Sequence, residues 1–458
     1  MTKETYDTLI VGAGAAGMMC AIEAGRRGRR VLVVDHARAP GEKIRISGGG
    51  RCNFTNTGTG PANFLGENPR FATSALRRFS QHDFVKRVDQ AGIAWHEKTL
   101  GQLFCDDSAK LIVRMLTDGM REAGVVLRTG TGVASVDRAG DGFAAVLSDG
   151  TAVTATSLVL ASGGRSIPKM GATGWACDTA RAFGLRVTET RPALVPLTFE
   201  TGLLETLLPL AGVAVDVVVK NRPEPTNTPT DNPASSSPKG DRPNVMASSC
   251  AERGRPNLMA SSSPKGDRPN IMPSSSAERG RPQKEIGFAE AMLFTHRGLS
   301  GPAILQISSY WREGEAITVS MAPGVDVLAR LKAAREENGG KAAVHTALGH
   351  IVPRRLAESL CEREQVSGKL AEVGGKALAR LDQAVNAWTV KPVGSEGYRT
   401  AEVTLGGVAT DQLDQQTMAV KTVPGLYVIG EAVDITGWLG GYNFQWAWSS
   451  GWAAGQVC

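Results

Sequence analysis

Apolar runs and glycine turns alternate at the start of the chain. Residues 8–11 (TLIV) and 31–34 (VLVV) are short apolar runs rich in β-branched side chains, and residues 18–27 between them carry helix formers. Short apolar runs beside glycine suit buried strands, and the longer run of helix formers suits a helix. The pattern predicts a strand–turn–helix–strand unit and therefore an α/β architecture.

The turn between the first strand and the helix has the spacing G-x-G-x-x-G. Gly12 permits a tight turn, Gly14 lets backbone N–H groups approach a pyrophosphate, and Gly17 lets the helix pack closely on the strand. Asp35 ends the second strand, about twenty residues beyond the first glycine, where a carboxylate accepts hydrogen bonds from an adenosine ribose. An acid at this position favours FAD or NAD over NADP. The unit predicts a dinucleotide site.

Helical and extended patterns alternate along the rest of the chain. Residues 92–106 predict a short antiparallel excursion, whose His96 and Cys105 are interpreted as structural. Two prolines around an extended run at 191–197 are typical of a crossing between domains. Helices are expected at 71–91, 109–123, 325–337, 342–351, 353–365 and 369–388, and strands at 125–129, 133–136, 158–161, 212–219, 287–293, 401–408 and 425–429.

Residues 234–256 and 260–282 are near copies of each other, with a period of 26 residues. They are rich in Ser, Pro, Gly and Arg and almost free of aliphatic and aromatic residues, so they cannot bury a core. A solenoid needs an apolar face and at least three copies. We therefore expect residues 222–284 to form a disordered insertion at a hairpin tip. A basic tether for an anionic partner is the alternative.

The formal net charge of the chain is +6, and residues 222–284 alone carry +4 of it, which leaves +2 for all other residues. So small an excess predicts no phosphate-binding surface. Charge therefore argues against nucleic acid as a partner and leaves a small-molecule substrate as the expectation.

Length and targeting signals set further bounds. The 458 residues suit two or three domains of about 150 residues each. No apolar run approaches the ~20 residues that span a bilayer, and no signal peptide precedes the first strand, so we expect a cytoplasmic protein without a membrane partner. The seven cysteines are scattered, with no C-x-x-C, and indicate neither a disulfide framework nor a metal site.

Several runs carry a family resemblance. Residues 41–56 (GEKIRISGGGRCNFTN) resemble the second signature of the BaiN-like flavoproteins, which are NAD(P)/FAD-dependent oxidoreductases. Residues 158–164 resemble that family's A-T-G-G strand end, with Ser162 in place of Thr. Residues 292–305 resemble its L-F-T-H-x-G-x-S-G-P-A motif, and residues 425–447 contain G-L-Y-V-I-G-E and G-G-Y-N-F-Q-W-A.

The resemblance implies a Rossmann-like FAD-binding domain of the two-dinucleotide-binding flavoprotein type, with an inserted β-rich domain and a small helical cap. The expected boundaries are 1–190 and 395–458 for the FAD-binding domain, 191–325 for the β-rich domain and 326–394 for the cap. The motifs and the resemblance together indicate these FAD contacts: Gly12, Gly14, Ala15, Ala16, Gly17, Asp35, Lys43, Gly48, Gly49, Gly50, Arg51, Cys52, Asn53, Val133, Ala161, Ser162, Gly163, Gly430, Glu431, Gly440, Gly441, Tyr442 and Asn443.

Individual roles follow from the same resemblance. Val133 meets the adenine, Glu431 holds the ribityl chain, and the helix after Gly441 stabilises reduced flavin. His296 is a candidate acid or a structural histidine. Cys52 is either a redox thiol, activated by Arg51, or a small residue packed beside FAD.

Two functions are compatible with these features. The first is an FAD-dependent oxidoreductase that passes hydride from NAD(P)H through flavin N5 to an electron-poor double bond or oxo group. NAD(P)H would then bind only transiently, because one dinucleotide turn is visible. The alternative is an FAD-binding scaffold without turnover, redox-sensing or RNA-associated.

Overall fold

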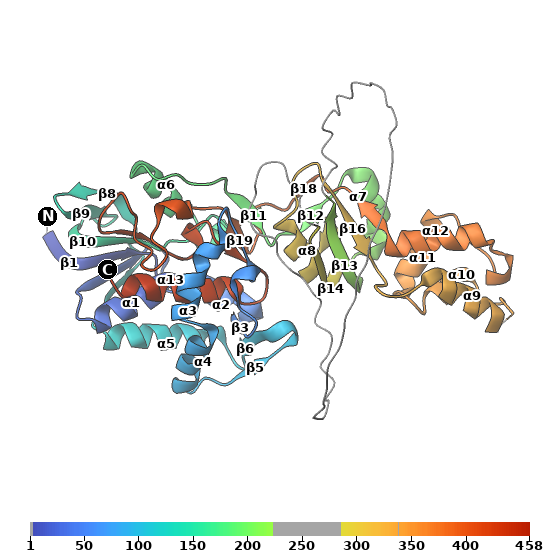
Figure 1. Ribbon diagram of the computed structural model, residues 1–458, viewed down its shortest axis with the longest axis horizontal. Helices are drawn as coiled ribbons and strands as arrows, with labels where there is room; N and C mark the ends of the chain where they lie inside the picture. Colours follow the sequence, from blue (N-terminus) through green and yellow to red (C-terminus); the bar gives the residue numbers. More distant parts are fainter. Residues whose placement is uncertain (1–2, 223–284, 338) are drawn as a thin grey trace, which may run out of the picture.

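The computed structural model describes residues 3–222, 285–337 and 339–458. The expectation for the repetitive insertion therefore lies outside the described residues. Figure 1 shows three parts along the long axis of the molecule: a sheet flanked by helices, a second sheet, and a group of helices at the far end. The first part is called the first body here, and the second sheet together with the far helices is called the second body.

The first body is built on a largely parallel sheet in the order β7-β2-β1-β10-β9-β8. Strand β10 organises it, because one edge pairs in parallel with β1, while the other pairs with β9 over its first half and with β20 over its second. This is the α/β, Rossmann-type architecture that the sequence predicts. The strands are β1 (Lys3–Val11), β2 (Val31–Asp35), β7 (Val126–Thr129), β8 (Val133–Ala139), β9 (Gly142–Leu147), β10 (Ala152–Leu160) and β20 (Leu426–Val428).

Helices α1 (Ala15–Arg26) and α13 (Tyr442–Gly455) pack against each other although they lie far apart in sequence. Gly451 faces Ala16, and Gly455, one turn later, faces Cys20, where an added Cβ would lie 2.7 Å from the carbonyl oxygen. The two helices therefore run in the same direction, with both N-termini at one end of the body. The other helices here are α2 (Glu42–Gly50), α3 (Ala72–Arg78), α4 (Gln81–Gln90), α5 (Ala109–Glu122) and α6 (Trp175–Ala182).

The single helix predicted at 71–91 is wrong, since the chain forms α3 and α4 there with a break at Phe79 and Ser80. Ser80 starts the second helix: Asp83 Oδ2 accepts from Ser80 N at 2.7 Å, and Ser80 Oγ accepts from Asp83 N at 3.4 Å. This reciprocal capping stops the first helix and starts another. The hydrophobic periodicity continues through the break and conceals it.

Three small sheets complete the first body and join it to the second. They are β3 (Asn53–Asn56), β6 (Gln102–Cys105) and β5 (Trp95–Glu97); β4 (Phe64–Leu65) with β21 (Thr436–Gly437); and β11 (Arg191–Ala193) with β19 (Val403–Leu405). In Figure 1 the β11–β19 pair lies where the chain passes between the two bodies.

The second body holds an antiparallel sheet in the order β17-β16-β13-β14-β15-β12-β18. Asn221 and Ile286 hydrogen-bond at the end of the β13–β14 pair, where the chain leaves and re-enters the described residues. Its strands and flanking helices are β12 (Leu197–Thr198), α7 (Thr201–Leu207), β13 (Ala214–Arg222), β14 (Gly287–Thr295), β15 (Gly298–Ser300), α8 (Pro302–Ser308), β16 (Ala316–Ser320), β17 (Trp388–Val390) and β18 (Gly394–Ser395).

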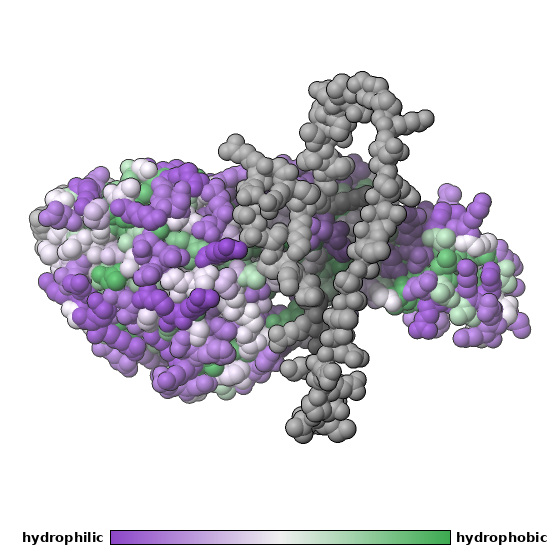
Figure 2. All heavy atoms as spheres, in the orientation of Figure 1, coloured by the Kyte–Doolittle hydropathy of each residue, from purple (hydrophilic) through white to green (hydrophobic). Residues whose placement is uncertain are grey.

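The far helices share the hydrophobic core of the second sheet. They are α9 (Val327–Glu337), α10 (Val344–Leu348), α11 (Arg354–Arg363) and α12 (Gly375–Asn386). Figure 2 shows hydrophilic residues over most of the visible face of the first body. Among the described residues, no helix has the length and apolar character needed to cross a membrane.

Candidate functional site

The carboxyl ends of four parallel strands meet at one edge of the first sheet. Gly12 follows β1, Asp35 ends β2, Ala161 follows β10 and Gly430 follows β20. These residues come from widely separated positions, yet the parallel pairing brings them together. Ligands of open α/β sheets bind at this edge.

The glycines of the first turn differ in what surrounds them. A Cβ on Gly12 would lie 2.5 Å from the carbonyl oxygen of Ala161, and one on Gly17 would overlap the carbonyl oxygen of Gly12. A Cβ on Gly14 would meet nothing within 4 Å. Gly12 and Gly17 are therefore required by packing, whereas Gly14 faces open space at the N-terminus of α1. That space fits a pyrophosphate, which helix N-terminal N–H groups bind.

Asp35 is held by backbone donors on both of its oxygens. Oδ2 accepts from Ala13 N at 2.7 Å, and Oδ1 accepts from Ala37 N at 2.8 Å. A carboxylate has about four acceptor sites, so lone pairs remain for a ribose. The backbone of Thr131 donates to Asp35 O at 2.8 Å and places the neighbouring Val133 beside the same edge.

Lys43 and Glu431 form an ion pair across 388 residues of sequence, with Nζ 2.7 Å from Oε2. Glu431 Oε1 also accepts from Ser166 Oγ and from Thr404 N, both at 2.9 Å. Burial works to raise the pKa of the Glu431 carboxyl, but the Lys43 ammonium and these hydrogen bonds together hold it below its ordinary value. Both charged groups are thus engaged with protein, and they fix the backbone around them.

Sequence reasoning missed Ser166 and Thr404. Thr404 Oγ1 accepts from Arg165 N at 2.8 Å, which closes the loop after β10 onto β19. Thr404 lies inside the run expected as a strand at 401–408, and Ser166 lies two residues beyond the run recognised at 158–164. Neither residue has a signal in the sequence, because its burial becomes visible only in the fold.

The last three residues of α2, all glycines, and Cys52 just beyond it have left-handed backbone conformations. A Cβ on Gly48 would lie 2.8 Å from the Phe104 ring, while one on Gly49 would meet nothing within 4 Å. Burial raises the pKa of the Cys52 thiol, so the thiol stays protonated at neutral pH. Cys52 and Cys105 are both free and buried. Arg51 is exposed beside them, and the Asn53 amide bonds the Gln102 side chain at 2.8 Å.

The turn that begins α13 is held by side-chain amides. Asn56 Nδ2 donates to Gly440 O at 2.9 Å. Asn443 uses its whole amide on the preceding backbone: Oδ1 accepts from Gly437 N at 2.7 Å, and Nδ2 donates to Gly437 O at 2.8 Å. Burial raises the pKa of the adjacent Tyr442 to about 12. Because the first N–H groups of a helix lack intrahelical partners, Gly441 and its neighbours offer donors to an anionic or carbonyl group.

Two residues near this edge, Ser162 and Gly430, bear on the fit of a cofactor. Ser162 Oγ, just after β10, is buried and has no hydrogen-bond partner among the described residues. A Cβ on Gly430 would lie 2.9 Å from the Cβ of Ala16 in the first turn of α1, so both residues pack closely there. An unpaired buried hydroxyl, an open glycine face and two helix N-termini suit a dinucleotide cofactor such as FAD.

His296 lies on the exposed turn between β14 and β15 in the second body. Thr295 organises the turn, since its Oγ1 accepts from Arg297 N and donates to Gly298 O, both at 3.2 Å. Among the described residues, none hydrogen-bonds the His296 ring. The turn lies against Leu197, in the strand that follows the crossing between the bodies.

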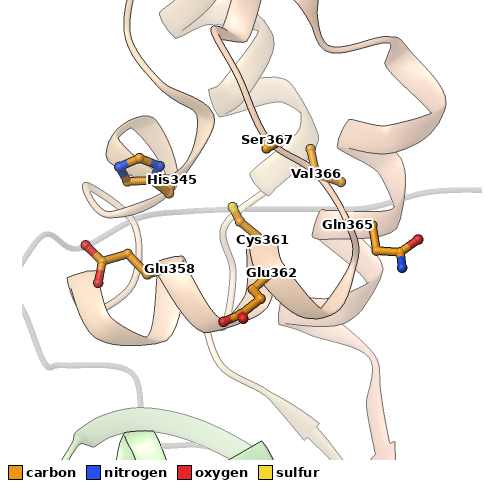
Figure 3. Close-up of a pocket in the computed structure, with 7 residues that line it drawn as sticks. All are labelled: His345, Glu358, Cys361, Glu362, Gln365, Val366 and Ser367. Atoms are coloured by element: carbon orange, nitrogen blue, oxygen red, sulfur yellow. The ribbon is translucent and has the colours of Figure 1, made fainter.

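A hollow of about 450 Å³ opens among the far helices and is lined by His345, Glu358 and Cys361, among others. Figure 3 shows these side chains around it. In Figure 1 these helices lie at the opposite end of the molecule from α1. Within the part of the chain that the structure describes, no group of three or more His, Cys, Asp or Glu side chains could hold a metal ion.

Comparison with known protein families shows a match over nearly the whole chain. The family described as HI0933-like protein Rossmann domain matches residues 6–457. The chain belongs to the HI0933-like family. The protein is a flavin-dependent oxidoreductase with a Rossmann-type fold.

Three relatives match this HI0933-like protein over nearly its whole length. It is 44% identical to a ribosomal RNA dihydrouridine synthase of Escherichia coli, over 99% of this chain and 98% of that one. It is 35% identical to a ribosomal RNA dihydrouridine synthase of Haemophilus influenzae, over 98% and 97%. It is 25% identical to a 3-dehydro-bile acid delta(4,6)-reductase of Clostridium scindens, over 98% of both chains.

The first two relatives overturn the expectation that nucleic acid is not a partner. That expectation rested on a net charge of only +2 outside the repeats. Net charge measures the sum over the surface, whereas recognition depends on how charge is distributed and on contacts to bases. A small net charge therefore does not exclude nucleic acid as a partner.

Proposed function

We propose that this protein binds FAD at the carboxyl edge of the first sheet and reduces the C5=C6 double bond of a uridine in ribosomal RNA. The observation that carries the proposal is 44% identity to a ribosomal RNA dihydrouridine synthase over 99% of this chain. Dihydrouridine differs from uridine by two hydrogens across that bond. We further propose NADH or NADPH as the donor of the hydride.

The chemistry agrees with the substrate class expected from the sequence. The C5=C6 bond of uracil is conjugated to a carbonyl group and is electron-poor. When bound, FAD supplies hydride transfer at its isoalloxazine ring. The relative named as a delta(4,6)-reductase supports the same class, a double bond that accepts hydride.

The chain's own residues bind and orient the cofactor in this proposal. Gly14 and the N-terminus of α1 receive the pyrophosphate, and Asp35 receives the adenosine ribose. The N-terminus of α13, after Gly441, donates toward the flavin, where a positive helix end favours negative charge on the reduced ring. Support comes from the open face of Gly14 and from the remaining lone pairs of Asp35.

A proton must accompany the hydride, and His296 is a candidate source. Its ring is exposed and has no partner among the described residues, which favours a role in chemistry over a structural one. His296→Gln should leave the free energy of unfolding within about 0.5 kcal/mol of wild type and lower turnover about a hundredfold. Flavin reduction by NAD(P)H should be unchanged. Unchanged turnover would remove His296 from the mechanism.

The decisive experiment supplies ribosomal RNA that lacks dihydrouridine, together with FAD-loaded protein and NADH or NADPH. Nucleoside mass spectrometry should show a product two mass units heavier than uridine, formed only with enzyme and reductant. An unsaturated 3-oxo steroid acid serves as the competing substrate. Reduction of the steroid without change in the RNA would replace the RNA assignment, and reduction of neither substrate would contradict the proposal.

A further inference from the structure

The two bodies meet along α8 and the residues that follow it. Leu194 N and Val195 N donate to Ser309 Oγ and Ser308 Oγ at 3.3 and 3.0 Å, which fastens the crossing between the bodies. Trp438 of the first body packs against both large hydrophobic cores. One helix of the second body thus holds the crossing, and its C-terminal extension reaches the segment that precedes α13.

Gln306 in α8 and Tyr310 just after it hydrogen-bond the segment that precedes α13. Tyr310 OH accepts from Trp438 Nε1 at 2.7 Å, and Gln306 Oε1 accepts from Leu439 N at 3.0 Å. Gln306 is only 5% exposed, and its Nε2 donates to Glu290 Oε1 at 3.2 Å. Both ends of the amide are therefore fixed. Rotation of the side chain would leave buried polar atoms unpaired, which is unfavourable.

The remaining anchors of this turn come from the first body. Asn63 O accepts from Trp438 N at 2.9 Å, and Asn56 binds Gly440 O. Among the described residues, Gln306 is the one from the second body that hydrogen-bonds the backbone of residues 437–441. Its contact lies two residues before Gly441, the N-cap of α13.

We propose that Gln306 is a positioning residue that ties the first turn of α13 to the second body and so sets its placement against the flavin. The inference rests on the FAD site proposed at α13. Helix N-terminal donors act on a charged ring only at hydrogen-bond distance. Movement of the second body, for instance when a large substrate binds, is therefore transmitted through Gln306 to the electronic environment of the flavin.

The central test is Gln306→Met, which keeps the side-chain length and removes the amide. The variant should still bind one FAD per chain, with a dissociation constant roughly tenfold higher because the Leu439 N–H loses its partner. The midpoint potential of the bound flavin should fall, since reduced flavin loses donors. In the apoprotein, hydrogen exchange at residues 437–441 should be faster than in wild type.

Two matched variants separate positioning from general stability. Gln306→Glu, made together with Glu290→Gln so that a donor still faces the new carboxylate, keeps an acceptor for Leu439 N and should restore the FAD affinity and slow exchange. Tyr310→Phe removes a hydrogen bond across the same interface without touching the backbone of the turn, and should keep the wild-type potential. Where Gln306→Met does not fold, Gln306→Asn, which withdraws the acceptor by one methylene, is measured instead.

The proposal is overturned if Gln306→Met lowers the melting temperature but leaves the potential, the FAD affinity and exchange at the turn unchanged. It is also overturned if Tyr310→Phe shifts the potential equally. Failure of wild-type protein to bind FAD would overturn the cofactor site and this inference together. A wild type that binds FAD but leaves RNA unmodified would overturn the assigned substrate alone.

Discussion

Gly451 of α13 lies directly against the backbone of Ala16 in α1. A Cβ at position 451 would overlap the Ala16 carbonyl oxygen, and the same close approach recurs one turn later at Gly455. The two helices whose N-termini reach the proposed cofactor site are therefore held together backbone to backbone. Small residues spaced four apart leave no side chain between them.

Gly451→Val tests this contact. The added side chain must push α13 away from α1, so we expect the free energy of unfolding to fall by about 1–3 kcal/mol and FAD content to fall with it. Urea denaturation and flavin absorbance measure both. Gly375→Ala is the control, because a Cβ there meets nothing within 4 Å. Equal stability of the two variants would contradict the close packing.

Gly14→Val should separate cofactor binding from folding. The position faces open space, so the apoprotein should melt within a few degrees of wild type, whereas FAD binding should be abolished by a side chain against the pyrophosphate. Gly17→Ala should instead destabilise the apoprotein, since its Cβ overlaps Gly12 O. Calorimetry and FAD titration distinguish the two. Chromatography of released flavin should find FAD; recovery of FMN alone would contradict the adenosine site.

Glu431→Gln should destabilise the protein in a pH-dependent way. The folded pKa of Glu431 lies below its ordinary value of 4.5, so its contribution is present above that pH and is lost as the pH falls through the folded pKa. We expect a loss of about 2 kcal/mol at pH 7 that shrinks below pH 4.5. Denaturation at pH 7 and at a pH below 4.5 measures this loss of stability.

The control for Glu431 is the exposed pair of Arg354 and Glu358, whose side chains are 81% and 45% exposed. Glu358→Gln should change the free energy of unfolding by less than about 0.5 kcal/mol at either pH. A pH-independent loss in Glu431→Gln would mean that lost packing, not charge, explains its effect.

Cys52→Ser should retain FAD and most of the turnover, because a thiol whose pKa is raised by burial is a poor nucleophile. Mass spectrometry after alkylation of folded protein at pH 8 should find Cys52 unmodified. Arg51→Ala, beside it, should weaken flavin binding by removing a charged donor. A serine variant that is reduced by NAD(P)H but passes no electrons on would make the thiol catalytic.

Deletion of residues 225–283 should change the free energy of unfolding by no more than about 1 kcal/mol, because closure entropy varies with the logarithm of loop length. Asn221 and Ile286 already hydrogen-bond, so a short connection can span the gap. Thermal denaturation and flavin content measure the outcome. If the deleted form loses affinity for RNA while keeping its stability, the repeats act as the basic tether considered from their composition.

Local pattern was enough to predict the βαβ unit and its glycine turn. Close backbone packing requires glycine at positions 12 and 17, and Gly14 faces open space. All three glycines lie in one short run of the sequence, where their spacing can be recognised. Asp35 is found from the same run, because its distance from the turn is set by the length of one helix and one strand.

Pairs of residues that are far apart in sequence could not be predicted in this way. Lys43 meets Glu431 across 388 residues, and a single sequence carries no signal that links two such positions. Gln306 also escaped notice, since a glutamine in a short apolar helix has many ordinary explanations. The break at Ser80 was missed because hydrophobic periodicity outweighed a Ser and Asp three residues apart, which is a recognised helix start.

Strand β10 has a consequence for how the protein is made. Its second half pairs with β20, at Leu158–Leu426 and onward, and α1 is covered by α13 at the end of the described chain. On a translating ribosome, the segment up to β10 therefore emerges with an unpaired strand edge and an uncovered apolar helix face. At roughly 5–20 residues per second, that exposure lasts on the order of 10–60 s. With the cofactor site proposed at α1 and α13, cofactor loading follows release of α13, and the nascent N-terminal half is an aggregation-prone form that a chaperone would protect.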